Sequence, residues 1–358
     1  MGGTLPMKPI LIERAGICST LQDLGRPDGG RWGVPWGGAM DHGAHRLASL
    51  LVGNSPDLAS IEMTVVGDTI QFPEETLIAW AGADLGGVLE FQGRALPLPA
   101  ERPVLVRAGV RLRLGTAATC GCRGYLAVAG GFDVAEVLGS QSTSLRSGWG
   151  GWQGRALRSG DRLPRGMKSE LSQRIQARLG SCGDQLLRSV PWFFRPVPIS
   201  DQAAVILRVV RGKHYSTLAP ASQKLFFSEF KITPQSDRMG YRLSGQALTF
   251  GVPMQELKSG GTVRGTIQLP LGSDQPLLLM ADGAPTGGYP ELAHVIAADW
   301  SAAAQLAPGT SIYFREVDLA EAHLRLKEQE QGLRLIADSL RRWTSEWGRE
   351  GADHVAAS

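Results

Sequence analysis

The sequence has few cysteines and no long apolar run, and these absences exclude several classes of protein. Its four cysteines, at positions 18, 120, 122 and 182, form no CxxC pair. Cys120 and Cys122 are close enough in sequence to share a metal, but no histidine lies nearby, so buried or unreactive thiols are the simpler interpretation. No stretch approaches the ~18 apolar residues of a membrane helix, and the first residues do not resemble a signal peptide. We therefore expect a cytoplasmic protein.

An excess of charge of one sign and the common catalytic motifs are also lacking. The chain carries 37 Lys and Arg against 34 Asp and Glu, and its net charge of +3 is too small to imply a nucleic acid or a membrane as partner. The patterns GxxxxGK[ST], GxSxG and HExxH do not occur. His42 and His45 could ligate a metal, but no third strong ligand is evident, and we predict no metal site.

Glycine, by contrast, is abundant. The 46 glycines among 358 residues are about twice the usual share of roughly 7%. An excess of glycine without a collagen period indicates many turns and bulges, which favours a β-rich fold. Single hydrophobic cores stop growing near ~250–300 residues, so the length predicts two domains.

Alternating and apolar runs predict many short strands and a few helices. Asp41 can cap a helix over 41–52. A short helix within 217–230 would place three phenylalanines on one face, and 293–306 is predicted to be partly helical. Strands are predicted at 9–14, 61–66, 110–114, 125–129, 205–210, 277–281 and 311–314.

The last forty residues have a pattern of their own. Asp318 and Glu321 have the spacing of a capping box at the start of a helix. Apolar residues then recur every seven positions, at Leu319, Leu326, Leu333, Leu340 and Trp347. This stripe predicts an amphipathic helix that packs on the rest of the protein, with a helix for self-association or a partner as the alternative.

Polar turns that contain glycine are the strongest functional signal. They cover 22–26 with 37–41, 234–242 and 282–290, each between apolar strands. Turns of this composition can hold a polar ligand. The simpler alternative is a set of surface ion pairs, which are common and stabilise little.

The most distinctive blocks of the sequence are 20–26, 33–35, 38–41, 46–48, 51–54, 76–84, 125–131, 234–245, 265–270 and 286–290. Together they resemble one known family, that of biotin-dependent carboxyltransferases, also called the allophanate hydrolase subunit 2 family. The resemblance extends over about residues 10–316, and the terminal helix is a departure from it. Within the family, stand-alone chains of this length are similar to the C subunit of 5-oxoprolinase.

The resemblance implies a fold and a reaction. The fold is β-rich (mixed α+β), with two cyclophilin-like β-barrel domains at 1–166 and 199–317. The residues themselves predict a linker at 167–198, which runs from a charged stretch to Pro191, Pro196 and Pro198, and a helical tail at 318–358. The reaction is the ATP-dependent opening of 5-oxo-L-proline to L-glutamate, together with 5-oxoprolinase subunits A and B, which would share the ATP. Two alternatives stay open, a carboxyltransferase subunit of a biotin-dependent urea carboxylase and a non-enzymatic antagonist of a kinase inhibitor. Only the first of these would use biotin.

Opening a lactam needs a cation for the substrate carboxylate, an acceptor for the lactam N–H, and donors where negative charge develops. Arg238 or Arg242 suits the first task and Asp237 the second. The Thr286 hydroxyl, with the backbone N–H groups of Gly287 and Gly288, suits the third, and His294 is a candidate acid or base, although a structural role is the simpler interpretation.

We predict that turns from both lobes meet in one cleft. The predicted catalytic residues are Asp237, Arg238, Thr286 and His294. The predicted substrate-binding residues are Gln22, Asp23, Arg26, Asp41, Gln235, Ser236, Arg242, Gly287, Gly288 and Tyr289.

Overall fold

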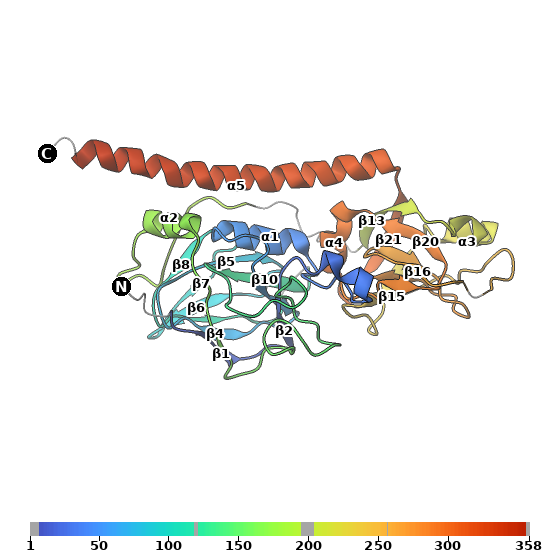
Figure 1. The fold of residues 1–358 in the computed structure, drawn as a ribbon, viewed down its shortest axis with the longest axis horizontal. Helices are drawn as coiled ribbons and strands as arrows, with labels where there is room; N and C mark the ends of the chain where they lie inside the picture. The colour runs from blue at the N-terminus through green and yellow to red at the C-terminus, as the bar shows by residue number, and fades with distance from the viewer. Residues whose placement is uncertain (1–6, 118–120, 195–203, 256, 356–358) are drawn as a thin grey trace.

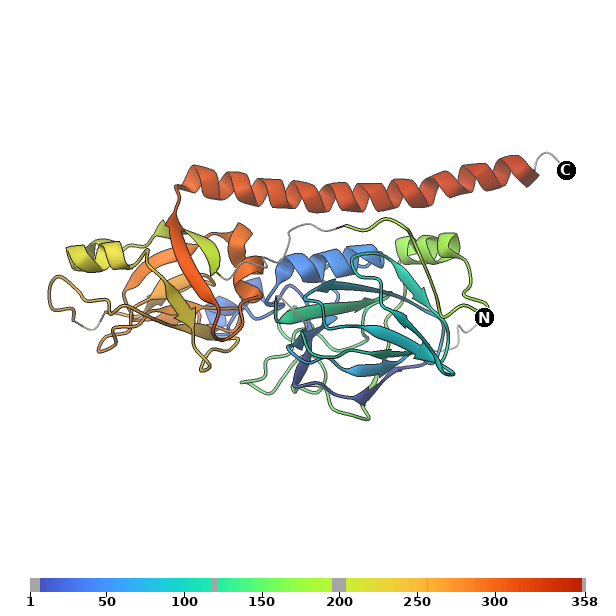
Figure 2. The same ribbon diagram turned by 180° about the vertical axis from the view of Figure 1, so that it is seen from behind.

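The computed structural model describes residues 7–117, 121–194, 204–255 and 257–355, and of 346–355 it describes the backbone only. Two β-rich lobes lie side by side, and one long helix runs across both (Figures 1 and 2). The predicted β-rich fold with a terminal helix is thereby confirmed. Cys120 lies outside the described residues, and the other three cysteines are free thiols, two of them buried.

The N-terminal lobe consists of two antiparallel six-stranded sheets packed face to face. Apolar residues from both sheets, such as Ile12, Trp80, Leu112 and Leu126, form the core between them. The first sheet has the order β11 (Arg162–Leu163), β1 (Ile10–Arg14), β4 (Thr69–Gln71), β9 (Arg111–Arg113), β6 (Val88–Phe91) and β7 (Arg94–Pro97). The second has the order β12 (Leu187–Ser189), β8 (Val104–Val106), β5 (Thr76–Gly82), β10 (Arg123–Val128), β3 (Ser60–Thr64) and β2 (Cys18–Gln22).

Two helices cover the outer face of the second sheet. The predicted helix is α1 (His42–Leu51), and its N-cap Asp41 accepts a hydrogen bond from the Ala44 N–H at 2.9 Å. The second is α2 (Glu170–Leu179), whose apolar face is buried through Ile175. Both α2 and β12 lie within 167–198, which the sequence predicted to be a linker, and here they extend the N-terminal lobe.

The C-terminal lobe is a closed seven-stranded barrel. Its strand order is β13 (Ala204–Arg211), β20 (Glu291–Val295), β17 (Thr266–Gln268), β18 (Leu277–Leu279), β15 (Gly240–Gly245), β14 (Phe230–Ile232) and β21 (Ser311–Glu316). The pair β13 and β21 is parallel and closes the barrel, while the other pairs are antiparallel.

Shorter elements surround this barrel. They are η1 (Pro27–Trp32) at the lobe boundary, η2 (Tyr215–Thr217), α3 (Pro220–Leu225), η3 (Ala297–Asp299), α4 (Trp300–Ala304), and a small ladder of β16 (Gly260–Gly261) with β19 (Thr286–Gly287). The short helix predicted within 217–230 is α3, but the predicted placement of its phenylalanines is wrong. Phe226 ends α3 and Phe227 follows it, whereas Phe230 belongs to β14, so the three rings do not share one helical face. Phe226 and Phe230 are still both buried in the barrel core, where each ring lies against Phe314.

The terminal helix α5 (Leu319–Val355) packs on the protein itself, as predicted. The Asp318 carboxylate accepts a hydrogen bond from the Glu321 N–H at 2.7 Å and caps the helix start. Leu333, Ile336 and Leu340 are buried, the latter two in the same cluster as α1 and α2, although Leu319 is 62% exposed. Within the described residues, no helix is long and apolar enough to cross a membrane.

Candidate functional site

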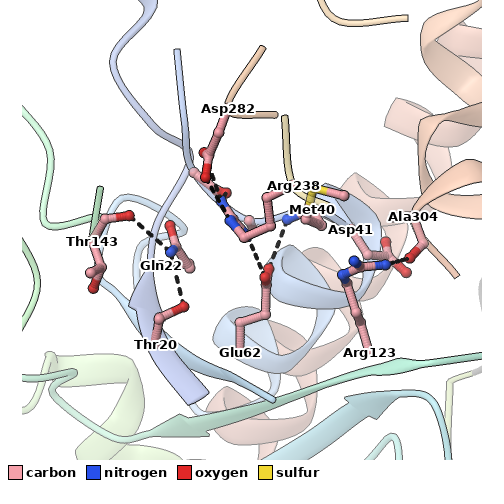
Figure 3. Close-up of polar contacts among 12 residues, drawn as sticks. Thr20, Gln22, Met40, Asp41, Glu62, Arg123, Thr143, Arg238, Asp282 and Ala304 are labelled. Atoms are coloured by element: carbon pink, nitrogen blue, oxygen red, sulfur yellow. Dashed lines mark hydrogen bonds and ion pairs between the residues drawn. The ribbon is translucent and has the colours of Figure 1, made fainter. Parts of the chain in front are cut away.

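Arg238 joins the two lobes. It lies in the turn before β15, and its guanidinium donates to both oxygens of Asp282, at 2.8 and 3.0 Å. The same group donates to the Gly38 carbonyl at 2.6 Å and to Glu62, both in the N-terminal lobe (Figure 3). Every guanidinium nitrogen is therefore already bonded, and no edge is left for a substrate carboxylate in this arrangement.

Glu62 is the buried partner of Arg238. Its carboxylate also accepts from the Tyr125 hydroxyl and from the Met40 N–H, each at 2.7 Å. Burial on its own would raise the pKa of Glu62, but the charges of Arg238 and Arg123 outweigh burial and lower this pKa below its ordinary value. Glu62 is thus a charged group enclosed in the lobe junction, stabilised by a partner from the other lobe.

Further side chains bridge the lobes around Met40, whose own side chain is buried in the core of the barrel. Arg123 donates to the Tyr241 hydroxyl at 2.9 Å and to the Ala304 carbonyl. Gln305 donates to the Asp41 carboxylate at 2.7 Å, and its carbonyl accepts two backbone N–H groups at 3.0 Å. These bonds hold the lobes in a fixed relation.

The predicted residues of the first turn lie inside the N-terminal lobe. Asp23 accepts hydrogen bonds from Ser140, from the Ser142 hydroxyl, and from the backbone N–H groups of Gly25 and Gln141. Its carboxylate orders the 140–142 loop. The simpler alternative for this turn, a surface ion pair of Asp23 with Arg26, does not form, because both side chains are buried and have other partners.

Arg26 and Gln22 are equally enclosed. The Arg26 guanidinium donates to the carbonyls of Val137 and Ser142 and lies 4.5 Å from the centre of the Trp149 ring. Gln22 donates to Thr20 and to the Thr143 carbonyl, and its own carbonyl oxygen is buried without a partner. Asp41 caps α1 and binds Gln305. The contacts described for Gln22, Arg26 and Asp41 hold loops and the start of α1 in position.

The first part of the turn 234–242 is largely exposed, whereas Gly240 and Tyr241 are buried. The Asp237 carboxylate accepts from the Met239 N–H at 2.8 Å and from the Gly240 N–H at 3.2 Å, which stabilises the turn. Ser236 accepts from the Arg242 N–H at 3.1 Å, while Gln235 and the Arg242 side chain face outward. Of this turn, Arg238 and the Tyr241 hydroxyl reach the lobe junction.

The second predicted turn lies next to a different group of polar side chains. Thr286 and Gly287 form β19, Gly288 and Tyr289 follow it, and His294 is on the neighbouring barrel strand β20. The His294 ring lies 3.2 Å from the Thr266 hydroxyl and 3.8 Å from Glu291. Burial lowers the pKa of His294, and the charge of Lys213 lowers it further against the opposing effect of Glu291. His294 is therefore a neutral imidazole at pH 7.

The predicted residues are thus brought together in part only. Arg238 and Asp41 lie at the lobe junction, and Thr286, Gly287 and His294 lie on one side of the barrel. Sequence reasoning missed Glu62, although an acidic residue inside the apolar strand β3 is a signal of a buried pair. It also missed Gln268 and Glu291, whose proximity follows only from the pairing of β17 with β20. Within the described residues, no three His, Cys, Asp or Glu side chains are grouped to hold a metal ion.

Comparison with known proteins defines the class. The family described as "Carboxyltransferase domain, subdomain A and B" matches residues 32–316. The chain belongs to this family, which confirms the resemblance of its sequence blocks.

Particular relatives follow from the same comparison. The C subunit of the Escherichia coli 5-oxoprolinase is 37% identical over 325 residues, which cover 89% of this chain and 94% of that protein. The C subunit of the Haemophilus influenzae 5-oxoprolinase is 36% identical over 330 residues, covering 92% and 96%. The solved structure of the K. lactis urea amidolyase is similar with a TM-score of 0.79 and 27% identity over 94% of this chain, but the chain spans only 20% of that much longer protein.

Proposed function

We propose that this chain is part of an ATP-dependent 5-oxoprolinase that opens the lactam of 5-oxo-L-proline to L-glutamate together with subunits A and B. The observation that carries the proposal is the alignment with the C subunits of two bacterial 5-oxoprolinases along 94% and 96% of their length. We expect the assembly in the cytoplasm, where ATP is available. A fold alone would not select this reaction, since related folds carry different chemistries.

The reaction needs a base and a proton donor. Water adds to the lactam carbonyl carbon and loses a proton, the C–N bond breaks, and the nitrogen gains a proton to give the amine of glutamate. We propose His294 as the group that accepts the proton of water. Its lowered pKa keeps the imidazole neutral, and Glu291 at 3.8 Å would stabilise the imidazolium once it forms.

ATP would supply the driving force for this uphill reaction. A triphosphate needs several free cationic or amide donors at one place. The arginines described at the lobe junction do not fit it, because Arg238 donates to two carboxylates and a carbonyl, and Arg123 donates to the Tyr241 hydroxyl and the Ala304 carbonyl. We therefore propose that ATP is bound with help from the partner subunits, and no step above passes through it.

Reconstitution tests the proposal. The chain is co-expressed with candidate A and B subunits, and glutamate release from 5-oxo-L-proline is followed with and without ATP. We expect ATP-dependent release, and His294→Ala should lower kcat by roughly 100-fold or more, which is typical for loss of a general base. The matched control is His323→Ala on the exposed side of α5, which should leave kcat unchanged. An assembled complex that releases no glutamate would refute the function.

A second function is favoured by the structural likeness to the urea amidolyase. In this alternative the chain transfers a carboxyl group from biotin to urea. The same reconstituted sample, supplied with urea, ATP, bicarbonate and a biotin carrier, distinguishes the two. Turnover of urea without turnover of 5-oxo-L-proline would replace the first proposal by the second.

A further inference from the structure

A polar group of side chains covers the outer side of β17 and β20 in the barrel. Gln268 and Glu291 are cross-strand partners and are 3% and 6% exposed. Lys213, in the turn after β13, places its ammonium 3.3 Å from Glu291 and extends to the surface. We call Lys213, Gln268 and Glu291 the barrel-side cluster, and His294 lies at its edge.

Gln268 gives a sign of a ligand. Its side-chain nitrogen is buried and has no hydrogen-bond partner, although Gln268 lies among polar neighbours. A buried donor without an acceptor is costly and is rare in native proteins. An acceptor supplied by a ligand would satisfy it.

The ladder of β16 and β19 covers this amide and lies next to Lys213. Gly287 lies directly over Gln268, and a Cβ at this position would come within 3.3 Å of the Gln268 nitrogen. Gly287 does not have a positive φ, so its backbone does not require glycine. A Cβ at Gly260 on the partner strand would lie 3.7 Å from the Lys213 ammonium. The backbone of Gly287 therefore packs closely on the Gln268 amide, and a larger residue at 287 would have to displace that amide.

The order of the groups indicates the ligand. A five-membered lactam holds its amide in the cis form, so the N–H and the C=O groups lie side by side on one edge of the ring. In 5-oxo-L-proline the carboxylate is attached next to the nitrogen, which gives the order carboxylate, N–H, C=O. The cluster offers the complementary order: the cation Lys213, the acceptor Glu291 and the donor Gln268.

We propose that the barrel-side cluster binds the cis-amide edge of a lactam acid, with Gln268 donating to the carbonyl, Glu291 accepting from the N–H and Lys213 binding the carboxylate. The proposal rests on the proposed function for the identity of the lactam. It places the substrate on one lobe, beside His294, and away from the bonded arginines of the lobe junction. Urea and the ureido ring of biotin share the cis-amide edge but present no carboxylate next to it.

Two variants and four ligands test the proposal. Binding of 5-oxo-L-proline, 2-pyrrolidinone, urea and biotin to the full-length chain is measured by saturation-transfer NMR and calorimetry. Glutamate release by the reconstituted complex is measured in parallel. Lys213→Met should weaken 5-oxo-L-proline binding at least roughly tenfold and leave 2-pyrrolidinone binding unchanged, because only the first ligand has a carboxylate. Gln268→Met should weaken the binding of both by roughly three- to tenfold.

Controls keep the outcomes distinct. Lys231→Met and Gln246→Met change exposed residues of the same lobe and should alter neither binding nor KM. If the complex releases glutamate and neither cluster variant changes KM or binding, the site is wrong while the function stands. If the complex is inactive on 5-oxo-L-proline but the chain binds urea or biotin in a Gln268-dependent way, the function is wrong while the site stands. If none of the four ligands binds and the complex is inactive, both proposals are overturned.

Discussion

Replacing Arg238 by alanine should destabilise the protein strongly through Glu62. The Glu62 side chain is only 1% exposed and is charged in the folded protein. The substitution removes its ion pair but leaves its carboxylate buried, together with the hydrogen bonds from Tyr125 and Met40. It also removes both bonds to Asp282 and the bond to the Gly38 carbonyl.

The size of the effect follows from these contacts. Removing one partner of a buried pair typically costs about 3–5 kcal/mol. Asp282 is more exposed than Glu62 and can be hydrated, so most of the loss should come from Glu62. We therefore expect a loss of about 3–4 kcal/mol in the free energy of unfolding.

Urea unfolding, followed by tryptophan fluorescence and by circular dichroism, measures this loss. Coincident transitions from the two probes would show that the lobes unfold together. Arg242→Ala is the matched control, because Arg242 lies in the following strand with an exposed side chain and should change the free energy by less than about 0.5 kcal/mol. Adding Glu62→Gln to Arg238→Ala should restore at least about 1 kcal/mol, since the buried charge is removed. An Arg238→Ala protein within about 1 kcal/mol of the wild type would refute the reasoning.

Three further predictions concern other parts of the molecule. Leu340→Ala should cost about 2–4 kcal/mol because Leu340 is buried between α5 and the N-terminal lobe. Leu335→Ala on the exposed side of α5 should cost less than about 0.5 kcal/mol, and thermal unfolding compares the two variants. Arg155 lowers the pKa of Asp161 from 3.8 to about 2, so this ion pair should stabilise the folded protein by about 1–2 kcal/mol above pH 3.8. The stabilisation should disappear as the pH falls towards about 2. Urea unfolding across this range should show that the difference in stability between Asp161→Asn and the wild type shrinks as the pH falls. Gln305→Ala leaves two backbone N–H groups without an acceptor, and hydrogen exchange at these amides should become at least roughly tenfold faster. Unchanged exchange would count against a role of Gln305 in holding the two lobes together.

Local structure was largely predictable because it depends on near neighbours in sequence. The alternation of Arg111, Leu112 and Arg113 predicted β9, in which only the leucine is buried. Asp41 and Asp318 predicted the starts of α1 and α5, because a cap acts on a backbone N–H three residues away. The structure of 167–198 was harder to predict. Its prolines suggested a linker, but α2 and β12 form there because they pack on parts of the lobe that are distant in sequence.

The candidate sites depended on contacts between distant residues. The turn 234–242 was visible in the sequence, but its four polar residues go to different places: Arg238 into the lobe junction, and Gln235, Ser236 and Asp237 to the surface. Asp23 also lies in a polar turn that was visible in the sequence, but its carboxylate accepts hydrogen bonds from the 140–142 loop and not from a ligand.

By itself, the sequence determined that this is a β-rich member of the carboxyltransferase family with a packed terminal helix, because glycine content, alternation, caps and short sequence blocks are local properties. Tertiary structure alone decided that Arg238 meets Glu62, 176 positions away, and that Gln268 stands beside Glu291. The physical reason is that burial and strand pairing set which polar groups lose water and which partners remain within reach, and neither is fixed by nearby residues.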